Sequence, residues 1–234
     1  AGFKLKKKKK NTSIEPVIAD DGKYKKYEWS VKNLAPVKYE LGAVSTADMF
    51  PHINIVLDQF SHYGNPGKFT TWGSYGKWMN DLYTGLDVLP ENRRQYFKDL
   101  VKDAQDDKEK IRRLYSYMQK NFRYVSIQLG IGGWKPFSAE FTDQKKYGDC
   151  KALSNYMKAT LNAIGIKSHV VMIRAEYNSE PLDPSFPTDN FNHAVLCVPL
   201  SKDSVWLECT SPTAEFGVLG TSTENRNALL LTDN

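Results

Sequence analysis

One stretch, Tyr147–Leu161 with the sequence YGDCKALSNYMKATL, constrains the fold more than any other part of the chain. Its apolar residues recur at helical spacing from Ala152 onward, which predicts a helix that begins near Cys150. Asp149 is placed to cap this helix, and Gly148 to form the sharp turn before it. Free backbone N–H groups and the helix dipole at such a position favour thiolate over thiol. The stretch therefore predicts a reactive cysteine, whereas a lone cysteine near a helix is more often a small buried hydrophobic residue.

Two later segments contain the partners that a catalytic thiol requires. FNHAVLCVPL, from Phe191 to Leu200, is predicted to be a buried strand with His193 near its start. VWLECT, from Val205 to Thr210, is predicted to be the next strand, with Glu208 near its end. A nucleophilic thiol needs a base, and the base needs a group that orients it. The order of Cys150, His193 and Glu208 along the chain therefore predicts a nucleophile, a base and an orienting acid.

The GDC helix, the NHAV strand and the WLECT strand together resemble the transglutaminase-like branch of the papain-type cysteine enzymes. They are most similar to the bacterial kind, in which this core follows a β-rich amino-terminal domain. The segment YVSIQLGIGGWKP, Tyr124–Pro136, resembles the same branch. The resemblance implies that Cys150 is the nucleophile, His193 the base and Glu208 the third member of a triad. The family usually has aspartate in a Trp-x-Asp-Pro-Thr-like context where this chain has Glu208 followed by Cys209.

The fold implied by the resemblance is α+β, with a transglutaminase-like/papain-like core of helices packed on an antiparallel β-sheet. A partial β-rich segment, residues 1–68, is predicted to precede this core and to be trimmed at its beginning. The transglutaminase-like domain is predicted to cover residues 69–234. The predicted boundary is a linker, Asn65–Phe69, because Pro66 and Gly67 tend to interrupt regular structure.

The predicted activity is acyl transfer through a thioester on Cys150. With water as the acceptor the protein would be a hydrolase, a peptidase or amidase, which is the leading prediction. With an amine as the acceptor it would cross-link proteins at glutamine as a transamidase. A third alternative, a degenerate module that binds peptide or glycan without turnover, stays open because of Glu208. The oxyanion would be met by the backbone N–H of Cys150, with Gln128 and Trp134 as candidates for a second donor or for the lining of the cleft.

The resemblance also implies partners and a location. The expected substrate is an amide of a peptide, a protein or the cell wall, and the expected location is periplasmic or extracellular, with no signal peptide in this chain. No metal or organic cofactor is implied, because a thiol and an imidazole supply the chemistry. No apolar run approaches the roughly 20 residues that a transmembrane helix needs.

The formal net charge of +5 is due to lysines near the N-terminus. Lys4 and the run Lys6–Lys10 hold six lysines, and removing these six charges from +5 leaves −1. Such a run is typical of a solvated tail or of a charged edge strand that prevents aggregation. No nucleic-acid-binding motif accompanies it, so no nucleic-acid partner is predicted.

The chain has three cysteines, Cys150, Cys197 and Cys209, so at least one thiol is unpaired within the chain. A disulfide between Cys197 and Cys209 is compatible with neighbouring strands and stays open. A zinc site formed by the cysteines and His193 is disfavoured because no C-x-x-C pair is present.

The remaining elements follow from local patterns. His169, on a predicted strand, has no motif partner and is interpreted as structural. The polar segment from Tyr177 to Asn190 is predicted to be a loop over the active end of the sheet. Helices are predicted over 72–86, from Pro90 to Val101 and over 107–122. Strands are predicted over 122–127, 167–175 and 228–231, and residues 11–64 have a strand-like sequence pattern throughout.

Overall fold

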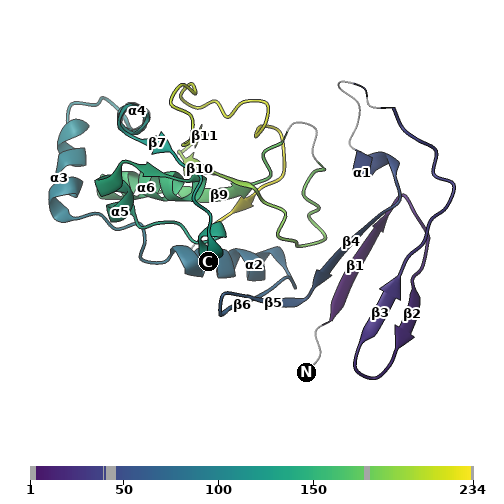
Figure 1. The fold of residues 1–234 in the computed structure, drawn as a ribbon. Coiled ribbons are helices and arrows are strands. Elements are labelled where there is room, and N and C mark those ends of the chain that lie inside the picture. Colours follow the sequence, from purple (N-terminus) through teal and green to yellow (C-terminus); the bar gives the residue numbers. More distant parts are fainter. Residues whose placement is uncertain (1–3, 39, 41–45, 177–179, 233–234) are drawn as a thin grey trace.

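The computed structural model describes residues 4–38, 40, 46–176 and 180–232, with β-ribbons at one end and a helix-and-sheet core at the other (Figure 1). The ribbons confirm that the N-terminal region is rich in strands. They are β1 (Leu5–Lys10) with β4 (His52–Leu57), β2 (Val17–Asp20) with β3 (Lys25–Glu28), and β5 (Gln59–His62) with β6 (Asn65–Lys68), all antiparallel, with the short helix α1 (Thr46–Met49) before β4. The strand-like segment over 36–44 falls mainly outside the described residues.

The lysine run forms strand β1, and acidic side chains neutralise much of its charge. Alternate residues of a strand share a face, so Lys6, Lys8 and Lys10 point the same way. Lys8 pairs with Asp183 and Lys10 with Glu180 at 3.1 Å, so this face of β1 contacts the segment that leads to His193. On the other face, Lys9 pairs with Glu15.

The prediction of an irregular linker at Asn65–Phe69 is wrong, because Asn65–Lys68 is strand β6 of a hairpin. Pro66 is tolerated because β6 pairs with β5 alone, so its missing N–H falls on a strand of a two-stranded ribbon. Gly67 allows the ring of Phe60 to approach, since a Cβ at this position would lie 2.3 Å from the ring. Phe60 in turn packs against the buried core, which attaches the hairpin to helix α2.

The core is an antiparallel four-stranded sheet with the order β11-β10-β9-β12, which confirms the predicted α+β class. Its strands are β9 (His169–Ile173), β10 (His193–Pro199), β11 (Ser204–Leu207) and β12 (Leu229–Leu230). The helices are α2 (Trp72–Tyr83), α3 (Glu91–Leu100), α4 (Asp107–Asn121), α5 (Ala139–Lys145), α6 (Cys150–Ala163) and the 3₁₀-helix η1 (Gly130–Gly133). A short parallel pair, β7 (Arg123–Tyr124) with β8 (Tyr147–Gly148), precedes α6.

Helix α6 lies at the centre of the core, between the sheet and helices α3, α4 and α5 (Figure 1). A helix buried on nearly all sides must pair its polar side chains as well as pack its apolar ones. Asn155 donates to the carbonyl of Leu86 at 2.8 Å, and Thr160 donates to the carbonyl of Met157 at 2.8 Å. These internal hydrogen bonds let a helix with polar residues occupy a buried position.

A buried carboxylate, Asp143, joins three elements around α6. It accepts hydrogen bonds from Arg93 Nε at 2.8 Å, from the Tyr156 hydroxyl at 2.7 Å and from Lys146 Nζ at 2.9 Å. Burial alone would raise the pKa of Asp143, but these donors hold it below its usual range. The network therefore links α3 to α5 and to α6, where the predicted nucleophile lies.

Two local predictions differ from the structure. Helix α5 was not expected, because its seven residues are too few for a clear periodicity; Ser138 caps it by accepting from the Phe141 N–H at 3.2 Å. The strand predicted over 122–127 is limited to β7, which pairs only with the two residues of β8.

Candidate functional site

Cys150 is the first residue of α6 and is buried, with 3% of its surface exposed. Asp149 caps the helix as predicted, since its Oδ1 accepts from the Ala152 N–H at 2.9 Å. Its other oxygen forms a buried ion pair with Lys151. At the first helical position the backbone N–H of Cys150 has no carbonyl of the helix to bond. The helix start is therefore rigid and presents the thiol next to an available backbone donor.

Gly148 acts differently from the prediction of a sharp turn. It belongs to β8, and a Cβ at this position would lie 2.8 Å from the Cβ of Ala152. Glycine is required here because the chain approaches the first turn of α6 too closely for any side chain.

The cysteine helix is attached to the histidine strand one turn beyond the thiol. The hydroxyl of Ser154 donates to the backbone carbonyl of Ala194 at 3.3 Å, and α6 packs along β10. Ser154 follows Cys150 by one helical turn, and Ala194 directly follows His193. This contact fixes the distance between the two elements that carry the predicted nucleophile and base.

His193 opens strand β10, and its Nε2 lies 2.8 Å from Oε2 of Glu208, just beyond β11. The carboxylate accepts, so Nε2 carries the proton, and Nδ1 is the ring nitrogen left to exchange a proton with a thiol. The structure thus brings His193 and Glu208 together as expected from the sequence.

Burial alone would lower the pKa of His193, but interactions with the Cys150 thiol and the Glu208 carboxylate raise it to about 9. Burial likewise favours the neutral form of Glu208, yet hydrogen bonds from His193 and Thr210 and the charge of His193 lower its pKa. The environment therefore favours an imidazolium next to a carboxylate and a thiol. Such a combination is typical of sites that activate a cysteine.

Glu208 has further partners that sequence reasoning missed. Its Oε1 accepts from the Thr210 hydroxyl at 2.6 Å and from the Thr210 N–H at 3.0 Å. Its backbone carbonyl accepts from the Tyr115 hydroxyl at 2.7 Å. A threonine two residues after a candidate acid was the only sequence signal for the first contact, whereas Tyr115 lies far away in the sequence.

Asn192 and Asp203 are polar residues close in sequence to His193 and to β11, and both side chains have other partners. The Asn192 side chain accepts from the Ala175 N–H at 2.6 Å and donates to the Ala175 carbonyl at 3.0 Å. Asp203 accepts from the Ser204 N–H at 2.7 Å in the turn before β11. Glu208 is thus the acid that contacts His193.

All three cysteines lie in the described part of the chain, and each has a free thiol. Cys209 packs in the main core together with Cys150, whereas Cys197 belongs to a separate cluster on the sheet. The disulfide left open between Cys197 and Cys209 is therefore absent from this structure. His169 Nδ1 donates to the carbonyl of Leu231 at 3.1 Å, in agreement with a structural role.

Trp134 follows η1, and its ring stacks on His62 with centroids 4.3 Å apart. Its indole N–H donates to Asp189 Oδ2 at 2.7 Å, and the Tyr75 hydroxyl donates to Oδ1 of the same carboxylate at 2.5 Å. Asp189 thus connects α2, the segment that follows η1 and the segment before His193. Gln128 is exposed, and among the described residues no hydrogen bond joins it to Cys150, His193 or Glu208.

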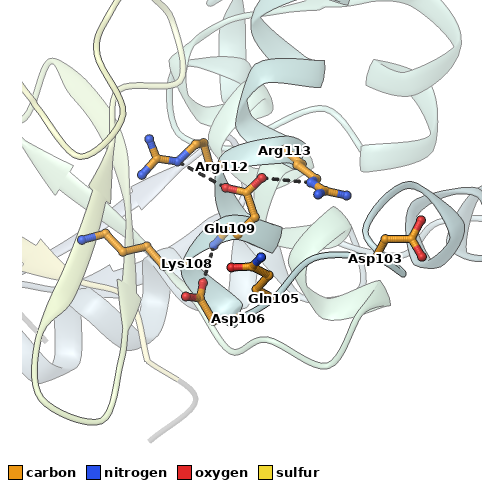
Figure 2. A pocket seen from close by; sticks show the side chains of 7 residues that line it. All are labelled: Asp103, Gln105, Asp106, Lys108, Glu109, Arg112 and Arg113. Atoms are coloured by element: carbon orange, nitrogen blue, oxygen red, sulfur yellow. Dashed lines mark hydrogen bonds and ion pairs between the residues drawn. The ribbon is translucent and has the colours of Figure 1, made fainter.

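A charged hollow of about 380 Å³ at the start of α4 is a separate feature. Figure 2 shows Glu109 between Arg112 and Arg113, with the Asp106 carboxylate accepting the Glu109 N–H. The three acidic and three basic side chains that line the hollow balance in formal charge. Within the described ranges no group of three or more His, Cys, Asp or Glu residues is arranged to hold a metal ion. No described helix has the length and apolar character to cross a membrane.

Comparison with known families bears on this geometry. A sequence model of the transglutaminase-like superfamily matches residues 94–212, about half of the chain, which include Cys150, His193 and Glu208. The chain belongs to the transglutaminase-like superfamily. Membership in the transglutaminase-like superfamily supports a cysteine-type enzyme in general terms.

Two solved structures resemble this transglutaminase-like protein. The first is described as a candidate protease from Parabacteroides distasonis, with 14% identity, a TM-score of 0.62, and coverage of 89% of this chain and 38% of that chain. The second is described as a candidate cysteine protease from Cytophaga hutchinsonii, with 16% identity, a TM-score of 0.41, and coverage of 55% and 40%. The first likeness shows the fold, and this chain spans 38% of the length of that protein. No curated protein matches the chain.

Proposed function

We propose that this transglutaminase-like protein is a cysteine-dependent acyl-transfer enzyme that hydrolyses amide bonds, with Cys150, His193 and Glu208 as its triad. The observation that carries the proposal is the 2.8 Å contact between His193 Nε2 and Glu208 Oε2, on a histidine whose pKa the nearby Cys150 thiol helps to raise. A base with an orienting acid, next to a thiol at a helix start, is the combination that nucleophilic catalysis by cysteine requires.

In the proposed reaction, Cys150 Sγ, as a thiolate, forms a bond to the amide carbonyl carbon. The backbone N–H of Cys150 stabilises the negative oxygen of the tetrahedral intermediate. His193 then gives its Nδ1 proton to the leaving nitrogen, the C–N bond breaks, and a thioester remains on Cys150. His193 next takes a proton from water, the water oxygen bonds to the acyl carbon, and the thiolate leaves. Throughout, Glu208 holds the imidazole by Nε2 and stabilises its charged form.

The acceptor, the substrate and the location belong to the proposal as well. We favour water as the acceptor and an amide of a peptide, a protein or the cell wall as the substrate, in a periplasmic or extracellular setting. Gln128 stays a candidate for the second oxyanion donor. Trp134 fits a role in the cleft wall better, because its N–H already donates to Asp189.

A test that needs no knowledge of the substrate uses an activated ester. Brief reaction with p-nitrophenyl acetate, acid quench and peptide mass spectrometry should locate an acetyl group on Cys150, and both Cys150→Ser and His193→Ala should prevent its fast formation. Acetylation of Cys197 or Cys209 instead would overturn the assignment. Adding a primary amine to the trapped acyl-enzyme then distinguishes the acceptors. Release as acetate supports hydrolysis, whereas release mainly as the acetamide supports the transamidase alternative.

A further inference from the structure

The Glu208 carboxylate is held at both oxygens, and only one of them serves the histidine. Oε2 lies 2.8 Å from His193 Nε2, while Oε1 accepts the Thr210 hydroxyl at 2.6 Å and the Thr210 N–H at 3.0 Å. Glu208 is buried with 8% of its surface exposed, so water does not satisfy Oε1 in place of these donors. Among the described residues, Thr210 therefore supplies two of the three hydrogen bonds to this side chain.

This arrangement matters because glutamate has one more rotatable side-chain bond than aspartate. Each additional free torsion must be fixed before the carboxylate can orient a partner, and fixing it costs conformational entropy. The Tyr115 hydroxyl fixes the main chain of Glu208 by donating to its carbonyl at 2.7 Å. That contact leaves the end of the side chain free to rotate, so a second restraint is needed at the carboxylate itself.

We propose that Thr210 is a positioning residue of the site, whose hydroxyl orients the Glu208 carboxylate so that it holds His193 in the productive geometry. The proposal rests on the proposed function of His193 and Glu208. The hydroxyl and the N–H of Thr210 both donate to Glu208 Oε1, so Thr210 acts through Glu208.

Four titratable groups on the elements around Glu208 bear on the titration of the Glu208–His193 pair: Cys150 on α6, His193 on β10, Cys209 directly after Glu208, and Tyr115 on α4. Burial raises the pKa of Cys209 and of Tyr115, and the charge of Glu208 raises both further. These two groups therefore stay neutral near neutral pH. His193 is left as the group whose titration reports the position of the carboxylate.

The test compares Thr210→Val, which removes the hydroxyl but keeps the backbone N–H, with Thr210→Ser, which keeps both donors. One readout is the titration of the His193 ring by NMR, and the other is the rate of acetylation of Cys150 by p-nitrophenyl acetate. For Thr210→Val we expect the His193 pKa to fall by roughly 0.5 to 1 unit and acetylation to slow about 3- to 10-fold near pH 8. Thr210→Ser should resemble the parent. Thr213→Val, an exposed threonine in the same segment, is the matched control and should change neither readout.

A double-mutant cycle with Glu208→Gln separates positioning from general structural support. If Thr210 acts through the carboxylate, Thr210→Val adds little once the charge of Glu208 is gone. Full additivity, or a Thr210→Val variant equal to the parent in both readouts, would overturn the role of Thr210. If Thr210→Val does not fold, the Thr210→Ser variant decides. A His193 pKa in Thr210→Ser that is lowered as far as in Glu208→Gln would overturn the role of the Thr210 hydroxyl. A His193 pKa in Thr210→Ser equal to that of the parent would support this role. A parent in which His193 titrates near its ordinary value and Cys150 is not acetylated would instead count against the triad itself.

Discussion

His193 opens β10 and Glu208 directly follows the adjacent antiparallel strand β11, and their side chains meet with Nε2 and Oε2 2.8 Å apart. The pairing register of β10 with β11 aligns Leu196 with Leu207, so Glu208 emerges at the same end of the sheet as His193. Helix α6 reaches this end through the Ser154–Ala194 contact. Glu208, His193 and Cys150 thus lie where three elements end or begin.

Replacing His193 with alanine should lower kcat/KM by roughly 10²- to 10⁴-fold, because the variant has no general base and no proton donor for the leaving group. Fold stability, followed by thermal unfolding, should change much less. His169→Ala is the matched control, since His169 also opens a strand, and its ring bonds the Leu231 carbonyl at 3.1 Å rather than an acid. If His169→Ala were the inactive variant, the base would be misassigned.

Substitutions at Glu208 should rank in activity as parent, then aspartate, then glutamine. Aspartate keeps the charge that stabilises the imidazolium but reaches less far, and glutamine loses the charge. Loss of an orienting acid costs up to about 10⁴-fold in serine proteases and often less where a thiolate pair already exists. Steady-state kinetics on one substrate would measure the order. An inert parent that gains activity on Glu208→Asp would support the degenerate binding module instead.

The pH dependence should reflect the raised pKa of His193, about 9. The imidazolium is needed as the proton donor, so kcat/KM should decline as pH rises through about 9 rather than near the ordinary histidine value. The same shift contributes stability that is fully present below the unfolded-state pKa and is lost as pH rises through the folded-state value. Glu208→Gln should move the alkaline decline to lower pH. A parent whose activity already falls near pH 6.5 would contradict the proposed pairing.

Asp143 provides a test of structure apart from catalysis. Asp143→Ala should lower the free energy of unfolding by about 2–4 kcal/mol, because Arg93 and Tyr156 lose a buried partner. The partial exposure of Arg93 limits the loss, since solvent screens its charge. The Asp143 pKa is lowered in the fold, so this stabilisation is present above the unfolded-state pKa and is lost as pH falls through the folded-state value. Urea unfolding measures the loss, and Glu140→Ala, exposed on the same helix, is the control. A loss no larger than that of the control would show that the network contributes little.

Local patterns in the sequence were sufficient for much of the fold and for choosing the residues of the proposed site. The helical spacing after Cys150 predicted α6, and Asp149 before it predicted the cap that the structure confirms. The apolar runs around His193 and before Glu208 predicted two successive strands. These predictions succeeded because hydrophobic periodicity and capping act over a few residues, within one element.

Only the tertiary structure decided the features that depend on residues far apart in the sequence. Pro66 and Gly67 indicated a linker, yet they lie in β6, because a hairpin with β5 places Gly67 under the ring of Phe60. Asn192 directly precedes His193 in the sequence, yet its side chain bonds Ala175, and the strand register brings the carboxylate of Glu208 to His193 instead. Which side chains meet at a sheet edge depends on pairing and packing of the whole chain, which no local pattern encodes.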